Sequence, residues 1–146
     1  MDHTAAPRRR RRVPTFTPVP TRARADGWTP ARQAGFIAAL HITGRVDKAA
    51  AAVGLSRQSA YRLRERADAD SFAAAWDAIL YNHGQPLPRK VTQTELFQRV
   101  QNGVLRPVVH AGRHCLTLCL QDNKALMMLI RHFARAGAGA PDERLG

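Results

Sequence analysis

Apolar side chains recur at helical spacing in two stretches of the first half of the chain. They stand three and four positions apart in WTPARQAGFIAALHITG, and at i, i+3, i+4, i+7 and i+8 in DSFAAAWDAILYNHG. Thr29 and Pro30 are typical of the first positions of a helix, and Gly44 is typical of its end. Asp70 or Ser71 is the expected cap of the second helix. The pattern therefore predicts two amphipathic helices.

The segment between them is KAAAAVGLSRQSAYRLRER, at positions 48–66. Its first half has mostly small side chains, and its second half is rich in charged ones. Ala50 lets two short helices approach closely. Gly54 is expected to turn the chain with a positive φ, where a β-branched residue would be strained and would push the helices apart. Ser56 is the expected N-cap of the second helix. The inward stripe of this second helix is predicted to hold Ala60, Leu63 and Ala67. The opposite side is predicted to carry Gln58, Tyr61, Arg62 and Glu65, flanked by Arg57, Arg64 and Arg66. This pattern is typical of a helix-turn-helix, whose second helix reads the major groove.

The pattern changes after a linker that contains Gly84, Pro86 and Pro88. TQTELFQRVQNG predicts a short helix with Leu96, Phe97 and Val100 inward and Gly103 at its end. VLRPVVHAGRHCLTLCL predicts a hairpin, with Pro107 on an edge strand and with His114, Leu116, Leu118 and Leu120 on one face. DNKALMMLIRHFARA predicts a closing helix. Its residues 125–130 are apolar on all sides, which favours burial or self-association.

These elements predict a mainly α protein, in which an N-terminal helix-turn-helix (trihelical) domain is followed by a helix, a β-hairpin and a C-terminal helix. The trihelical domain is expected at 28–84, with Trp28 and Trp76 in its core. An α+β hairpin region for oligomerisation is expected at 85–136. Residues 137–146 are predicted to fray. Residues 1–27 are rich in proline and carry seven arginines against two aspartates, which predicts a disordered basic arm.

The net charge of the chain indicates what kind of partner it binds. The 146 residues carry a formal net charge of +12, which favours nucleic acid or an anionic membrane as partner. No apolar stretch is long enough to span a membrane, and no apolar core follows the basic N-terminal run as in a secretory signal. Pro7, Pro14, Pro18 and Pro20 would break the helix of an organellar transit peptide. We therefore expect a cytoplasmic bacterial protein that is associated with the nucleoid when bound to double-stranded DNA.

The expected DNA contacts come from two places. The outer surface of the second helix of the turn supplies Ser56, Arg57, Gln58, Ser59, Tyr61, Arg62, Arg64 and Arg66, and the arm supplies Arg8, Arg9, Arg10, Arg11 and Arg12. Ala50 and Gly54 are expected to shape the turn itself. The ring of Tyr61 either stacks on a sugar or reaches a phosphate, or else it covers the helix surface. Because a single helix-turn-helix discriminates poorly, we expect a homo-oligomer joined through the C-terminal region.

Residues 28–82 resemble the small helix-turn-helix proteins of alphaproteobacteria and their phages, which are similar to the DNA-binding domain of phage terminase small subunits. Residues 90–135 resemble the rest of that group more loosely. The resemblance implies a trihelical DNA-binding domain in which Arg57, Gln58, Tyr61 and Arg62 match the positions that read bases and phosphates. The chain departs from terminase small subunits because no segment is long enough for their helical hairpin. This departure favours a transcription regulator or phage-type factor over DNA packaging, and a helical interaction module that binds no DNA is the alternative of another class.

Catalysis and metal binding are not expected. Ser56 is explained by capping, and no histidine and carboxylate are placed to activate it as a nucleophile. The sequence has no phosphate-binding glycine loop and no acidic cluster for magnesium. Cys115 and Cys119 lie near His110 and His114, but the spacing lacks the paired knuckles of a structural zinc site. We interpret the two cysteines as small buried residues, and we expect no metal and no cofactor.

Overall fold

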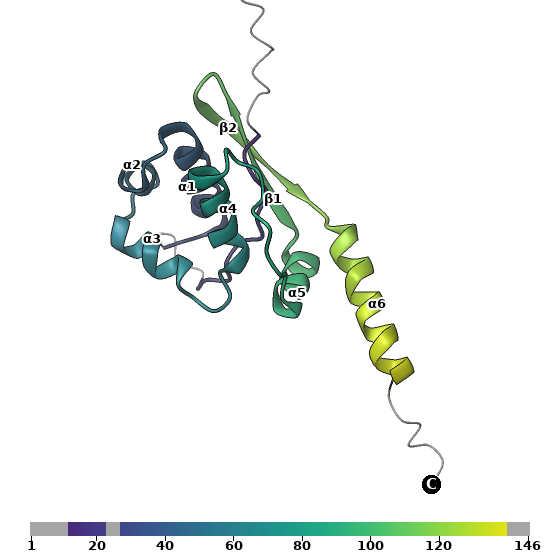
Figure 1. Cartoon of the computed structure of the whole chain (residues 1–146). Coiled ribbons are helices and arrows are strands. Elements are labelled where there is room, and N and C mark those ends of the chain that lie inside the picture. Colours follow the sequence, from purple (N-terminus) through teal and green to yellow (C-terminus); the bar gives the residue numbers. More distant parts are fainter. Residues whose placement is uncertain (1–11, 23–26, 140–146) are drawn as a thin grey trace, which may run out of the picture.

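The computed structural model describes residues 12–22 and 27–139, with side chains up to residue 137. In these ranges the elements are α1 (Pro30–Thr43), α2 (Val46–Ala52), α3 (Arg57–Arg64), α4 (Asp70–Tyr81), α5 (Gln93–Asn102), β1 (Val104–His110), β2 (Arg113–Leu120) and α6 (Asn123–Gly139). The expected mainly α fold with a helix-turn-helix, a hairpin and a closing helix is confirmed (Figure 1). Helix α6 extends through Gly139, past the predicted start of the fraying tail, and residues 140–146 lie outside the described ranges.

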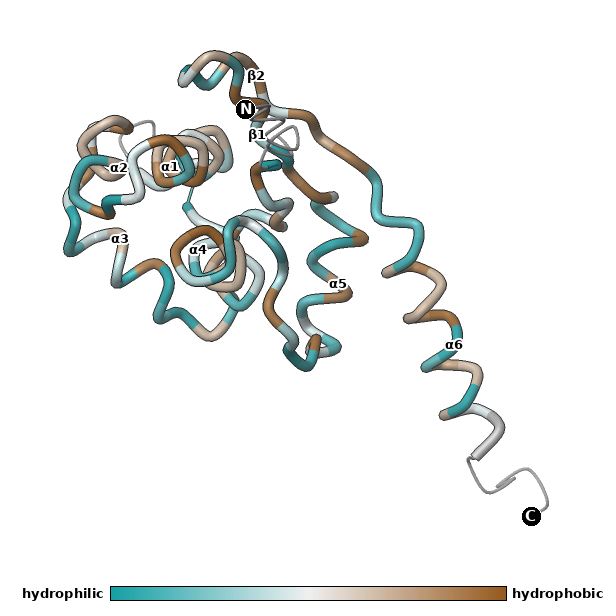
Figure 2. The backbone as a smooth tube through the Cα atoms, turned by 45° about the horizontal axis from the view of Figure 1, so that its top comes forward, coloured by the Kyte–Doolittle hydropathy of each residue, from teal (hydrophilic) through white to brown (hydrophobic). Residues whose placement is uncertain are grey.

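An aromatic cluster joins α1 to α4. Phe36 lies at its centre, with ring centroids 5.4 Å from Trp28, 5.1 Å from Trp76 and 5.7 Å from Phe72. All four rings are buried, so the expected place of both tryptophans in the core is confirmed. Hydrophobic positions on α1 and α4 colour these helices brown in Figure 2.

The ends of α1 are confirmed, whereas the cap of α4 is not. Thr29 accepts a bond from the backbone N–H of Arg32, and Gly44 closes α1 with a φ of 68°. Helix α4 begins at Asp70, and its N-cap Ala69 makes no side-chain bond. Ser71 is instead buried, and its hydroxyl accepts a hydrogen bond from the backbone N–H of Thr17 at 2.9 Å. Tertiary contact with a distant segment therefore takes the hydroxyl that would otherwise cap the helix.

Residues 12–22 form an extended segment, the N-terminal strap, which packs into the core. Phe16 is 1% exposed, and its backbone pairs with Leu105 of β1 through two hydrogen bonds of 3.0 and 2.7 Å. Val13 and Val19 are buried as well. The prediction of a disordered arm over 1–27 is therefore wrong for these residues. Three apolar side chains three positions apart supply the burial, and the prolines between them favour an extended backbone, which lowers the entropy lost on ordering.

A buried amide fixes the strap to α1. The side chain of Gln33 is fully buried and accepts a bond from the N–H of Val19 at 2.7 Å. Its NH2 group donates to the carbonyl oxygens of Val19 and Trp28, each at 3.0 Å. Burial of an amide without hydrogen-bond partners would lower the stability of the fold. Two of the three bonds of Gln33 go to Val19, so they favour the extended strap beside α1.

Helix α5 buries a different face from the one predicted. Leu96 is buried, but Phe97 and Val100 are exposed, and the polar residues Glu95 and Gln98 lie inward. Gln98 donates to the carbonyl oxygen of Asp68 at 3.3 Å. The prediction for Phe97 and Val100 is wrong because both inward polar side chains have hydrogen-bond partners, which an apolar stripe cannot reveal.

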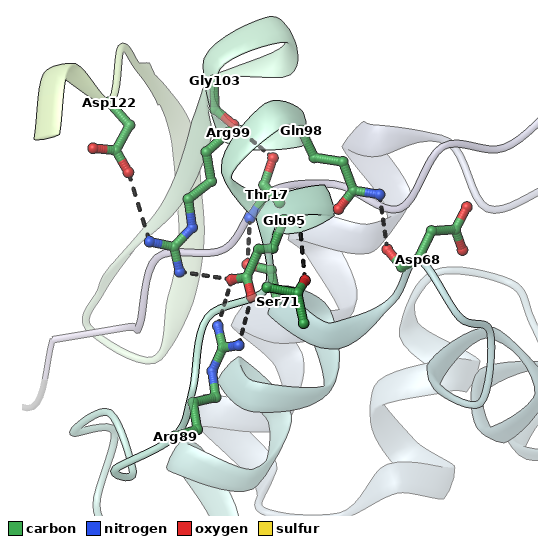
Figure 3. A network of polar contacts seen from close by, with 10 residues as sticks. Thr17, Asp68, Ser71, Arg89, Glu95, Gln98, Arg99, Gly103 and Asp122 are labelled. Carbon is green, nitrogen blue, oxygen red and sulfur yellow. Dashed lines mark hydrogen bonds and ion pairs between the residues drawn. The ribbon is translucent and has the colours of Figure 1, made fainter. Parts of the chain in front are cut away.

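Glu95 is the centre of the polar network in Figure 3. Its carboxylate, only 1% exposed, accepts bonds from the guanidinium groups of Arg89 and Arg99. Burial opposes the charge of Glu95, but the bonds from both arginines outweigh it and lower the pKa of the carboxyl below its usual value. Arg99 also lies 3.8 Å from Asp122, which precedes α6. Nearby, the hydroxyl of Thr17 in the strap donates to the carbonyl of Gly103, between α5 and β1, at 2.8 Å. The backbone N–H of Thr17 donates to Ser71 of α4, so the strap is bonded to both regions.

The hairpin is confirmed, with Ala111 and Gly112 at its turn at φ values of 50° and 73°. A bulge follows, because Val108 pairs with Leu116 while Val109 pairs with His114. Cys115 is the extra residue, and both cysteines are exposed, so the prediction that they are buried is wrong. The leucines of β2 are exposed as well, although α1 contacts both strands.

Helix α6 leaves the rest of the chain and packs mainly on α5 (Figures 1 and 2). Ala125 and Leu129 are buried with Leu96, and the rings of Phe97 and Phe133 lie 5.9 Å apart. Four other apolar residues in the run are 42–51% exposed, namely Leu126, Met127, Met128 and Ile130. Most of the apolar surface of this helix therefore faces outward.

We predict that Phe16→Ala lowers the free energy of unfolding by about 3–5 kcal/mol, as expected for a fully buried phenylalanine. Guanidinium chloride titration of the full chain measures the change. Tyr81→Ala is the control, because Tyr81 is 74% exposed and its loss should change stability by no more than about 0.5 kcal/mol. Equal stability of the Phe16 variant and the wild type would contradict the packing of the strap.

Candidate nucleic-acid interface

The turn between α2 and α3 has the geometry that its sequence predicts. Ala49 and Ala50 are fully buried, so the two helices pack closely. Gly54 has a φ of 74°, and the N–H of Leu55 donates to the carbonyl of Ala50 at 2.9 Å. Ser56 caps α3 by accepting a bond from the N–H of Ser59 at 3.1 Å. Ala50 and Gly54 therefore lie at the turn with the burial and the backbone conformation that the sequence predicts.

One part of the expectation for Gly54 is wrong. A Cβ atom built at this position would meet no atom within 4 Å, so a larger residue would not push the helices apart. The φ value alone makes the position unfavourable for other residues.

Helix α3 is buried on one side and open on the other. Ala60 and Leu63 are buried as expected, but α3 ends at Arg64, and Ala67 beyond it is exposed. Five residues line an open hollow of about 660 Å³ on the outer side, namely Ser56, Arg57, Gln58, Tyr61 and Arg62. These residues were predicted to share a face, and the structure brings them together.

Two of the predicted contact arginines are engaged within the chain. Arg64 makes a two-bond ion pair with Asp77, at 3.0 and 3.2 Å, and its guanidinium lies 4.8 Å from the ring centroid of Trp76. Arg66 pairs with Asp68 at 3.0 Å, although its side chain is 44% exposed. Arg64 is thus a packing residue, whereas Arg66 keeps part of its charge accessible.

Tyr61 has an internal contact that the sequence left open. Its ring centroid lies 5.1 Å from that of Trp76, and the guanidinium of Arg57 lies 5.5 Å from the ring centroid of Tyr61. The ring covers the helix surface over the core and at the same time positions Arg57. Ser59 is partly buried and donates its hydroxyl to the carbonyl of Ser56, so its main role is local.

The basic arm is only partly described. Arg8, Arg9, Arg10 and Arg11 lie outside the described residues. Arg12 is exposed and lines a pocket of about 960 Å³ with His83 and Arg106, so it lies beside the linker and β1 and not on the surface of α3. Arg22, at the other end of the strap, shares a pocket with Arg62. The sequence predicted a disordered segment around Arg22. The regular spacing of Val13, Phe16 and Val19 was the one signal that this segment packs against the core.

Two further features of the described residues bear on chemistry. In the described part of the chain, no three histidine, cysteine, aspartate or glutamate side chains are grouped so that they could hold a metal ion. Among the helices between residues 27 and 139, none is both long and apolar enough to cross a membrane.

We predict that Gly54→Val costs about 1–2 kcal/mol of stability, because a β-branched residue is strained at positive φ although space is available. Gly54→Asn is the matched variant and should cost less, since asparagine tolerates this region. Thermal unfolding of the two variants beside the wild type measures both effects. If valine proves harmless, the turn does not require a left-handed residue.

Comparisons with protein-family models, with curated proteins and with solved structures find no match for this chain. The resemblance to phage terminase small subunits therefore stays a prediction from the turn and its flanking helices. The geometry and the charge of α2, the turn and α3 are the features that bear on its function.

Proposed function

We propose that the chain binds double-stranded DNA and that α3 enters the major groove, as in a transcription regulator or a phage-type DNA-binding factor. The observation that carries the proposal is the outer side of α3, where Arg57, Gln58 and Arg62 are exposed beside Tyr61 on a helix fixed by a tight turn. Arginine and glutamine side chains match base edges in the major groove. The net charge of +12 favours the same partner.

A packaging role of the terminase small subunit type is the second candidate. Against it, the longest helix among the described residues is α6, with 17 residues, and it pairs with no second long helix. Selection of bound sequences from random duplex DNA separates the roles. A two-fold symmetric motif supports a regulator, whereas DNA binding without a motif supports packaging. A protein that binds no duplex would be a helical interaction module.

We also propose that a second copy of the chain covers the apolar surface of β2 and α6. This surface consists of Leu116, Leu118, Leu120, Leu126, Met127, Met128, Ile130 and Phe133, each 37–51% exposed. So many large apolar side chains on consecutive elements exceed the scattered exposure of an ordinary monomer surface. A two-fold dimer would also present two copies of α3 to two half-sites, which a single helix-turn-helix needs for discrimination.

We predict that Arg57→Ala and Arg62→Ala each weaken binding to the selected DNA by about 1–3 kcal/mol without loss of folding. Arg113→Ala is the control, because it removes the same charge from an exposed position at the hairpin turn. Fluorescence anisotropy with the selected duplex measures affinity, and circular dichroism checks the fold. If both α3 variants bind like the Arg113 variant, α3 is not the reading helix.

We predict that Met128→Glu converts the full-length protein from a dimer to a monomer, because an unpaired charge is not buried in an apolar interface. Light scattering at roughly ten times the dimer dissociation constant measures the mass. Tyr81→Glu adds the same charge at an exposed site outside this surface and should stay dimeric. Deletion of the residues after Gln85 is a poorer test, since it would remove β1 from Phe16. A monomeric wild type would contradict the proposal.

A further inference from the structure

A shallow pocket of about 520 Å³ lies where the end of the strap, the start of α1 and the side of α3 meet. Arg22 comes from the strap, and Trp28 precedes α1. Ser59 and Arg62 come from α3, and Arg66 follows its end. Forty positions separate Arg22 from Arg62 in the chain. Their meeting is therefore a product of the tertiary fold.

The described residues that line the pocket include several hydrogen-bond donors and no carboxylate. Within the described residues, Arg22 and Arg62 make no hydrogen bond and no ion pair, while Arg66 makes only its pair with Asp68. Trp28 also lines the pocket, and its Nε1–H is buried and has no acceptor among the described residues. Two free guanidinium groups and a third that is half-exposed make this a site for an anion.

The backbone that carries Arg22 is held in place. One residue before it, the hydroxyl of Thr21 donates to the carbonyl of Trp28 at 2.6 Å. Further along the strap, Gln33 bonds both the N–H and the carbonyl of Val19. An arginine on such an anchored segment loses less freedom on binding than one on a flexible arm.

We propose that this pocket is a clamp for a backbone phosphate of DNA, with Arg22 and Arg62 as its donors. The clamp rests on the proposed function of α3. Arg62 belongs both to this pocket and to the outer hollow of α3, so the two surfaces are continuous. A helix in the major groove is flanked by phosphates, and an arginine fork beside it meets a phosphodiester. The contact made by Arg22 positions α3 and reads no base, whereas Arg62 borders both the pocket and the outer side of α3.

The test uses the full-length protein with Arg22→Ala, Arg22→Lys and the control Arg113→Ala. Each variant is titrated with the selected duplex and with a scrambled duplex over a series of salt concentrations. Arg22→Ala should weaken binding to both duplexes alike, by roughly tenfold, and should lower the slope of log affinity against log salt by about 0.9. Arg22→Lys should keep the slope but lose part of the affinity, since a lysine lacks the planar fork. Arg113→Ala should match the wild type in slope.

A duplex carrying single uncharged methylphosphonates locates the contact. One position should weaken the wild type and leave Arg22→Ala unaffected. If the wild type binds with a steep salt slope and Arg22→Ala behaves like Arg113→Ala, the clamp is wrong while DNA binding stands. If the wild type binds no duplex, the proposed function fails, and the clamp fails with it. Because Arg22 is exposed and makes no hydrogen bond or ion pair within the described residues, all variants should unfold at the wild-type temperature.

Discussion

The burial of Phe16 holds the two halves of this protein together. Its ring packs at 5.9 Å from Phe72 of the helical half, and its backbone pairs with Leu105 of the hairpin. Because α1 also contacts both strands, the helix-turn-helix and the hairpin share one core, although the sequence suggests two regions. Without this strap, β1 would lose its neighbour, Gln33 would lose its partner Val19, and Arg22 would not be fixed beside α3.

Arginines with the same charge have different physical roles here. Arg64, Arg89 and Arg99 make ion pairs with partly or fully buried carboxylates. Arg64 joins α3 to α4, Arg89 joins the linker to α5, and Arg99 pairs with Glu95 within α5 and with Asp122 before α6. Arg22, Arg57 and Arg62 have no acidic partner within the described residues and face the surface around α3. Breaking a pair of the first group leaves a carboxylate with fewer partners, whereas removing an arginine of the second group leaves the fold intact. Net charge alone does not separate the two groups.

The proposed DNA contacts are of two kinds, those that read base edges and those that position α3 on the phosphate backbone. The outer side of α3 offers side chains that match base edges, and the neighbouring pocket offers donors that match a phosphate. The exposed apolar surface of β2 and α6 belongs to other elements than the surface proposed to bind DNA. A dimer through that surface would therefore leave α3 and Arg22 of both copies uncovered.

The sequence by itself determined the features that depend on neighbours within a few positions. The caps at Thr29 and Ser56, the left-handed turn at Gly54 and the two-residue turn of the hairpin all follow from local bonds and backbone preference. Only the tertiary structure decided the order of the strap, the inward face of α5 and the exposure of both cysteines. It also decided that Arg64 is paired and that Arg22 lies beside Arg62. These features depend on partners distant in the chain, and local periodicity carries no information about such partners.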